Sequence, residues 1–194
     1  MPDRRSSSIS TSAALLFQGG IGVVGLLAIW LFGIPILSGG LSLAEAVLFG
    51  VMGAAVTYLS LLLLTQNSWL FPDDLSSQMQ ALYDFVSGYR WPVLLALAVL
   101  AGVGEELLFR GAVQGWLLQY TGPWTAVLAA SVLFGLVHYV SFTYFLVATG
   151  LGLVLGAAYQ LSGSLELVMV WHAVYDMLAI YCLINYPHWF GVKR

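Results

Sequence analysis

Apolar residues fill this chain in long stretches that short polar segments separate. A helix needs about 20 apolar residues to cross the hydrocarbon core of a bilayer. Stretches that meet or approach this length cover residues 13–37, 41–64, 91–118, 124–139, 142–161 and 165–185. Clusters of glycine, serine and proline between them are typical of turns. The pattern therefore predicts an all-α, polytopic transmembrane helix bundle with about six transmembrane helices.

The one long polar interval, residues 65–90, has a different periodicity. Its apolar residues Met79, Leu82, Tyr83 and Val86 recur at the spacing of one helical face. Such a helix fits the bundle in two ways. It lies at the membrane surface as an amphipathic helix, or it packs on the bundle as an ordinary connector.

Composition identifies the solvent that surrounds most of the protein. Apolar residues make up 60% of the chain and charged residues 8%, whereas soluble domains carry about a quarter charged residues. Lipid must therefore cover most of the surface. We expect one transmembrane domain over residues 1–194, with a polar N-terminal tail over residues 1–12. No basic patch is present, so nucleic acid is not an expected partner.

The basic side chains predict how the chain is oriented in the membrane. Outside the predicted spans, the lysines and arginines are Arg4, Arg5, Arg90, Lys193 and Arg194. With an even number of spans, both termini and the polar interval lie on one side, which then carries all of these basic residues. Short loops rich in lysine and arginine stay in the cytoplasm. We therefore expect a multi-pass protein of the cell membrane with cytoplasmic N- and C-termini.

The third predicted span contains charged residues near its middle, namely Glu105, Glu106 and Arg110. Each charge at the centre of a bilayer costs about 2.5–3.5 kcal/mol, so these side chains must face the protein interior. Glu106 and Arg110 are four residues apart and can form an ion pair on one helical face. Glu105 points about 100° away and remains available as a base. The alternative is a purely structural polar network.

Two later spans add imidazoles and another carboxyl group. His138 lies in the fourth span, and the sixth contains His172 and Asp176 at a spacing that puts them on one face. Together with Glu105, the histidines supply the parts of a hydrolase that activates water. Counting residues places Glu105 near mid-membrane and His138 nearer the cytoplasmic end. A tilted or displaced fourth helix would be needed to bring them level.

These motifs resemble the signature motifs of a known family. The motifs Glu105-Glu106-x-x-x-Arg110, Phe134-x-x-x-His138 and His172-x-x-x-Asp176 are similar to those of the CPBP family. This family comprises the CAAX-protease and bacteriocin-processing (Abi) membrane proteases and includes the type II CAAX prenyl endopeptidases. The resemblance covers about residues 90–185, the predicted catalytic core. It implies a helical bundle with a water-accessible cavity and cleavage of a peptide bond within or next to the membrane.

The resemblance also implies a role for each residue. Glu105 would be the general base that activates water, and His138 would assist it. His172 and the residue four positions later would help to bind the oxyanion. Glu106 and Arg110 would hold Glu105 in place.

Asp176 departs from one branch of the resembled family. The prenyl endopeptidases typically have Asn at the position of Asp176. An Asn side chain can donate a hydrogen bond to an oxyanion, whereas an ionised Asp cannot. Asp176 would therefore orient His172 or act in its protonated form.

The expected function is that of an intramembrane endopeptidase. Its substrate would be a membrane-anchored protein or peptide, cleaved at a C-terminal tail, a leader or a sorting signal by a glutamate-activated water. We expect no cofactor, although Glu105, His138 and His172 are an acceptable set of zinc ligands. The alternatives are a proton-coupled membrane transporter and a non-catalytic membrane partner from the same family.

Overall fold

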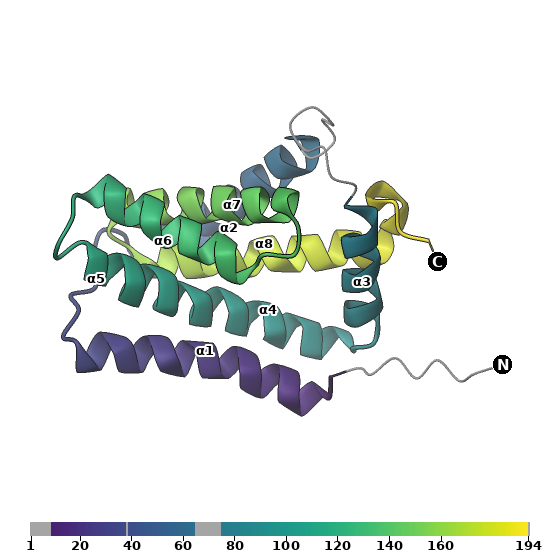
Figure 1. Ribbon diagram of the computed structural model, residues 1–194, viewed down its shortest axis with the longest axis horizontal. Helices are drawn as coiled ribbons and strands as arrows, with labels where there is room; N and C mark the ends of the chain where they lie inside the picture. The colour runs from purple at the N-terminus through teal and green to yellow at the C-terminus, as the bar shows by residue number, and fades with distance from the viewer. Residues whose placement is uncertain (1–8, 38, 65–74, 194) are drawn as a thin grey trace.

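The described part of the protein is all-helical. The computed structural model describes residues 9–37, 39–64 and 75–193, and no strand occurs among them. In chain order the elements are α1 (Thr11–Leu31), α2 (Leu43–Leu64), α3 (Ser76–Ser87), α4 (Trp91–Glu106), η1 (Leu107–Gln114), α5 (Gly115–Leu117), α6 (Pro123–Val137), α7 (Phe142–Ser162), α8 (Leu165–Asn185) and η2 (Pro187–Phe190). Most of the long helices run side by side along the length of the molecule (Figure 1). The predicted fold class is confirmed.

Long apolar helices make this fold a polytopic membrane bundle. Within the described ranges, five helices are long and apolar enough to cross a membrane, namely α1, α2, α7, α8 and the continuous helix Trp91–Leu117. Side chains such as Leu16 and Trp30 are each 76% exposed on the bundle surface, which suits a lipid environment. The remaining expected span is the apolar helix α6, which has only 15 residues. Its length is about 22 Å, less than the roughly 30 Å of a bilayer core.

The first helix ends earlier than the hydrophobic pattern predicts. α1 ends at Leu31, whereas the apolar stretch continues to residue 37. Gly33 has a φ of 58°, which is the left-handed conformation that glycine adopts most readily. Pro35 follows two residues later and has no backbone N–H to continue a helix. Hydropathy alone does not predict this helix end, because the residues that follow Leu31 are still apolar.

α3 is the amphipathic helix that the polar interval predicts. Its Val86 side chain is 3% exposed and packs with Leu94, Leu183 and Val192. The helix lies across one end of the bundle, beside the C-terminal segment (Figure 1). The apolar face of α3 therefore packs on the bundle, as expected for the second of the two alternatives, an ordinary connecting helix.

Contacts at this end bring distant parts of the chain together. The Tyr89 hydroxyl donates a hydrogen bond to the Ile9 carbonyl (2.7 Å), and the Lys193 backbone N–H donates to Gln80 of α3 (2.9 Å). The start of α1, helix α3 and the C-terminal segment therefore share one end of the bundle. The basic residues Arg4, Arg5 and Arg194 lie outside the described residues.

α4 and its continuation η1 form the centre of the bundle. α1 and α8 pack against α4, while α6 and α7 pack on each other and against η1. Glycines permit the closest of these contacts. A Cβ atom at Gly102 would lie 2.5 Å from the backbone nitrogen of Ala173 in α8. This close approach brings the polar residues of α4 and α8 within reach of each other.

Candidate active site

A buried ion pair anchors the polar residues of the central helix. Glu106, the last residue of α4, is fully buried, and Arg110 is 1% exposed in η1. Arg110 Nη1 donates to Glu106 Oε1 at 2.8 Å, as the spacing of four residues predicts. Its Nη2 donates to the Gly152 carbonyl of α7 (3.0 Å), and the guanidinium lies 4.9 Å from the centre of the Phe134 ring. The pair therefore links α4 to α6 and α7.

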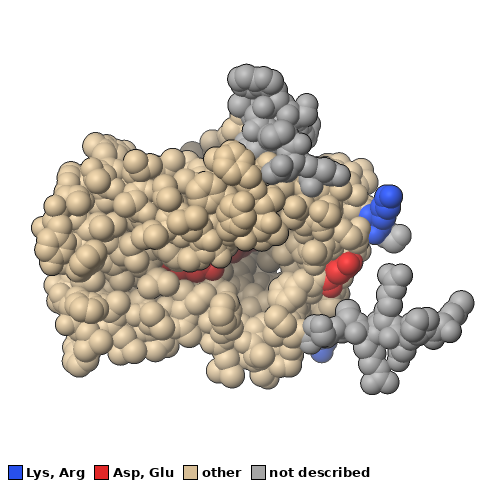
Figure 2. Space-filling model, viewed as in Figure 1, with Lys and Arg blue, Asp and Glu red and all other residues tan. Residues whose placement is uncertain are grey.

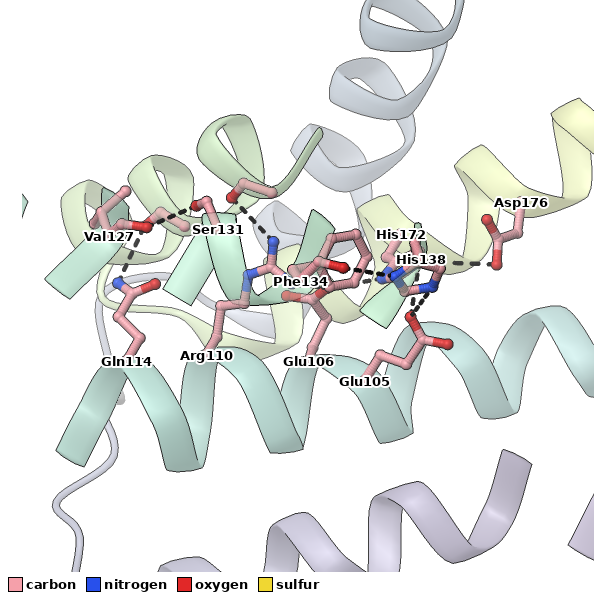
Figure 3. A network of polar contacts seen from close by, with 12 residues as sticks. Glu105, Glu106, Arg110, Gln114, Val127, Ser131, Phe134, His138, His172 and Asp176 are labelled. Atoms are coloured by element: carbon pink, nitrogen blue, oxygen red, sulfur yellow. Dashed lines mark hydrogen bonds and ion pairs between the residues drawn. The ribbon is translucent and has the colours of Figure 1, made fainter. Parts of the chain in front are cut away.

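The helix that carries this pair changes its winding next to the glutamates. η1 is a π-helix over Leu107–Gln114 and directly follows Glu106. π-helical turns within α-helices are uncommon and frequently occur at functional sites. Gln114 at the end of η1 is also buried, and its amide donates to the Gly156 carbonyl (3.2 Å). A row of polar side chains therefore points from this helix toward α7 (Figure 3).

Glu106 also orients His172 of α8. His172 Nδ1 lies 2.7 Å from Glu106 Oε1. A carboxylate paired with Arg110 can only accept a hydrogen bond, so Nδ1 carries the hydrogen. The other ring nitrogen, Nε2, then faces Glu105 Oε2 at 3.9 Å. The buried histidine is thus held at one nitrogen and presents the other to Glu105.

His138 approaches the same oxygen from α6. This helix ends at Val137, and His138 is its C-terminal cap. His138 Nδ1 lies 2.8 Å from the Phe134 carbonyl, which can only accept, so His138 Nε2 carries a lone pair in the neutral ring. That Nε2 lies 3.6 Å from Glu105 Oε2. Because α6 is short, its end lies beside the junction of α4 and η1, near the middle of the continuous helix Trp91–Leu117, which resolves the mismatch in depth that residue counting predicts.

Glu105 is the point at which these side chains converge (Figure 3). Its Oε2 faces the Nε2 atoms of both histidines at 3.6 and 3.9 Å, distances that are too long for direct hydrogen bonds. Its Oε1 accepts a hydrogen bond from the Gln18 amide of α1 at 2.8 Å. One carboxylate oxygen is therefore fixed, while the other shares a small space with two imidazoles.

Asp176 lies at the edge of this cluster. Its Oδ2 is 3.8 Å from His172 Nε2, and its side chain is 28% exposed. The predicted proximity of His172 and Asp176 on one face of α8 is confirmed. His172 therefore has carboxyl groups on several sides, because Glu105, Glu106 and Asp176 all lie within 4 Å of its ring nitrogens.

The cluster is open to the protein surface. The His138 side chain is 31% exposed, and that of Glu105 is 11% exposed. Figure 2 shows a hollow in one face of the molecule, with acidic atoms inside it. A water molecule between Glu105 Oε2 and His138 Nε2 would meet two acceptors and could donate a hydrogen bond to each.

A metal ion is the other species that such an arrangement of acceptors can bind. The candidate ligands are Glu105, His138 and His172, a set that zinc accepts. In the conformation described for residues 9–37, 39–64 and 75–193, no three His, Cys, Asp or Glu side chains are arranged to hold a metal ion. The residue types fit zinc, whereas their present spacing does not.

The structure brings all the predicted site residues into one cluster, but with different partners. The family resemblance implies that Glu106 and Arg110 hold Glu105 in place. Their hydrogen bonds connect them to each other, to Gly152 and to His172, so any such support acts through the helix that they share with Glu105. Sequence reasoning also missed Gln18 and Gln114. The signal was available, because a polar side chain inside an apolar span requires a partner.

Comparison with known proteins finds a family model that matches the segment containing this cluster. The family model described as type II CAAX prenyl endopeptidase Rce1-like matches residues 87–178. Among curated proteins, the chain is similar to the uncharacterized protein YpbD of Bacillus subtilis (strain 168), with 32% identity over 100 residues, which are 50% of this chain and 48% of that protein. The chain thus spans about half the length of this curated relative. No solved structure matches the chain. The segment that matches the type II CAAX prenyl endopeptidase Rce1-like family model, residues 87–178, contains every predicted site residue.

Proposed function

We propose that this protein is an intramembrane endopeptidase in which Glu105 activates a water molecule. One observation carries the proposal. Glu105 Oε2 lies 3.6 and 3.9 Å from the Nε2 atoms of His138 and His172, beside a hollow on the protein surface (Figure 2). A carboxylate and two imidazoles around a space of this size are suited to deprotonating water. The family of residues 87–178 supports a protease in general.

The distances support a specific order of proton transfer. Water bound between Glu105 and His138 gives a proton to Glu105 Oε2, and the hydroxide attacks the carbonyl carbon of the scissile peptide bond. In its doubly protonated form, His172 donates from Nδ1 to Glu106 and from Nε2 to the oxyanion. Glu105 then returns the proton to the leaving amine, so that the carboxylate is regenerated when the peptide bond breaks.

The location of the site supports a substrate that is held at the membrane. The hollow that contains the acidic atoms (Figure 2) lies in a bundle whose surface exposes many large apolar side chains, so the scissile bond must reach it close to lipid. We propose a membrane-anchored protein or peptide as substrate, cut at a C-terminal tail, a leader or a sorting signal. We further propose that the end carrying Arg90 and Lys193 faces the cytoplasm of the cell, because basic residues remain on that side.

The test is cleavage of defined peptides by the purified full chain in detergent. The probes are internally quenched peptides: a farnesylated C-terminal CAAX tail, the same tail without the lipid, and an unmodified single-span peptide. We expect wild type to cleave at least one probe. Glu105→Gln should lower kcat/KM by about 10²–10⁴-fold, the usual contribution of a general base.

Glu45→Gln is the matched control, because Glu45 is exposed and its hydrogen bonds at the start of α2 can also be made by glutamine. This variant should retain wild-type cleavage. Absence of cleavage of every probe by wild type, or undiminished cleavage by Glu105→Gln, would overturn the proposed function. Proton-coupled uptake into vesicles by the same preparation would then favour the transporter alternative.

A further inference from the structure

We propose that Gln18 of α1 is a positioning residue for Glu105, and that α1 thereby completes a site whose other residues lie in the family segment 87–178. This inference rests on the proposed function. The side-chain amide of Gln18 donates to Glu105 Oε1 at 2.8 Å. That hydrogen bond occupies one carboxylate oxygen and leaves Oε2 directed at His138 and His172.

The contact depends on unusually close packing of α1 against α4. Gly22 lies one helical turn after Gln18, and a Cβ atom there would lie 3.1 Å from the Cα of Gly104. In the reverse direction, a Cβ at Gly104 would lie 3.0 Å from the Gly22 nitrogen and 3.3 Å from the Gln18 carbonyl oxygen. Gly104 directly precedes Glu105. The two backbones therefore touch at the position where the Gln18 amide must reach the carboxylate.

The surroundings of Gln18 argue against an incidental polar residue. Its neighbours Leu16 and Phe17 are 76% and 72% exposed on the lipid-facing surface, whereas the Gln18 amide turns inward to Glu105. A polar amide inside a membrane span is unfavourable unless it is paired. The strong contact between Gln18 and Glu105 accounts for its place in an otherwise apolar helix.

The chemistry of an amide also suits this position. Arg110 pairs with Glu106 by charge at 2.8 Å, so that carboxylate is engaged in a short ion pair. Gln18 is a neutral donor, so it fixes the orientation of Glu105 while allowing Oε2 to accept a proton from water and release it. A cation at position 18 would oppose this cycle. The two neighbouring glutamates thus have different partners: Glu106 pairs with the charged Arg110, and Glu105 accepts a hydrogen bond from the neutral Gln18.

The first experiment replaces Gln18 with leucine, which has similar bulk, suits an apolar helix and has no donor. Gln119→Leu is the matched control, because Gln119 is exposed at the end of α5. With the probe that wild type cleaves, Gln18→Leu should lower kcat about tenfold, as expected for the loss of a hydrogen bond to a charged group. KM should stay within about twofold. Gln119→Leu should match wild type in both constants.

A second variant separates positioning from packing. Gln18→Glu preserves the shape of the side chain but places a second carboxyl group against Glu105, so kcat should fall at least as far as in Gln18→Leu. Wild-type kcat in either variant, or a rise in KM at unchanged kcat, would overturn the proposal. Infrared spectroscopy provides a readout that needs no substrate. The carboxylate band that disappears in Glu105→Gln should shift in Gln18→Leu and remain in place in Gln119→Leu.

The outcomes distinguish this inference from the proposed function. If Glu105→Gln abolishes cleavage while Gln18→Leu retains wild-type kcat, only the role of Gln18 is refuted. If wild type cleaves no probe, the proposed function fails, and the infrared shift alone decides whether Gln18 holds Glu105. An unshifted band in Gln18→Leu would then refute the inference as well.

Discussion

The polar network along the central helix has a closed end and an open end. At the closed end, Glu106 and Arg110 are buried and bonded at 2.8 Å. At the open end, Glu105 faces His138 at 3.6 Å, and the histidine side chain is 31% exposed. The two glutamates are neighbours in sequence, yet helical geometry turns them toward different surroundings. Short, dry contacts create a rigid support, whereas longer contacts beside solvent leave room for a water molecule.

The largest effect on stability should come from the closed end. Glu106→Gln removes the charge that balances Arg110, which is 1% exposed. Leaving a buried charge without its partner costs about 3–5 kcal/mol. We expect a marked fall in the free energy of unfolding, measured by denaturation in detergent. The exposed control Glu45→Gln should unfold like wild type, and equal stability of both variants would contradict a supporting role for Glu106.

At the open end, removal of His138 should affect the rate more than the stability. Its Nδ1 hydrogen bond goes to Phe134 within the same helical turn, so His138→Ala should cost only about 1 kcal/mol of stability. We expect kcat/KM to fall by about 10²-fold, the lower end of the range for acid–base groups.

The matched control is His188→Ala, because His188 is exposed in η2 at the end of the chain. It should retain wild-type kcat/KM on the same peptide probe. If His138→Ala and His188→Ala cleave at the same rate, His138 takes no part in the reaction.

Treatment with a metal chelator distinguishes a metal-free mechanism from a zinc-dependent one. In the proposal, Glu105 activates water without a metal, so incubation with a chelator should leave cleavage within about twofold of the untreated enzyme. Zinc bound by Glu105, His138 and His172 would instead make the activity sensitive to the chelator and restorable by added zinc. The measurement is the rate of probe cleavage before and after dialysis against the chelator.

A small effect should follow from a change at Asp176. Glu106 already holds His172 at 2.7 Å, whereas Asp176 lies 3.8 Å away and is part exposed. Asp176→Asn keeps the shape of the side chain and adds a donor, so we expect kcat/KM within about threefold of wild type. Asp84→Asn on the exposed face of α3 is the control. A tenfold or greater loss specific to Asp176→Asn would show that its carboxylate orients His172 or carries a proton.

The sequence predicts those contacts that depend on residue spacing within one helix. The spacing of Glu106 and Arg110 gives their ion pair, and that of His172 and Asp176 gives their proximity. Hydropathy gives the fold class and five of the long helices. The family motifs predict which residues gather at the site. These features are local, or they are recorded in patterns that recur between proteins.

Contacts between helices are harder to predict because they depend on packing distances. The approach of α1 to α4 through Gly22 and Gly104 places Gln18 beside Glu105, and no spacing within one helix encodes this contact. The bond from Glu106 to His172 likewise requires the close packing of α4 and α8 at Gly102. The early end of α6 at Val137, which brings His138 to the site, depends on where a helix terminates rather than on its hydropathy.

The most direct test of the two-ended network measures kcat and the unfolding midpoint for Glu105→Gln and Glu106→Gln in the same detergent preparation. The structure predicts that the two effects separate. Glu105→Gln should lose at least about 10²-fold in kcat with a midpoint near that of wild type, and Glu106→Gln should have the lower midpoint. Wild-type kcat in Glu105→Gln, or a loss of stability in Glu105→Gln equal to that in Glu106→Gln, would contradict this account.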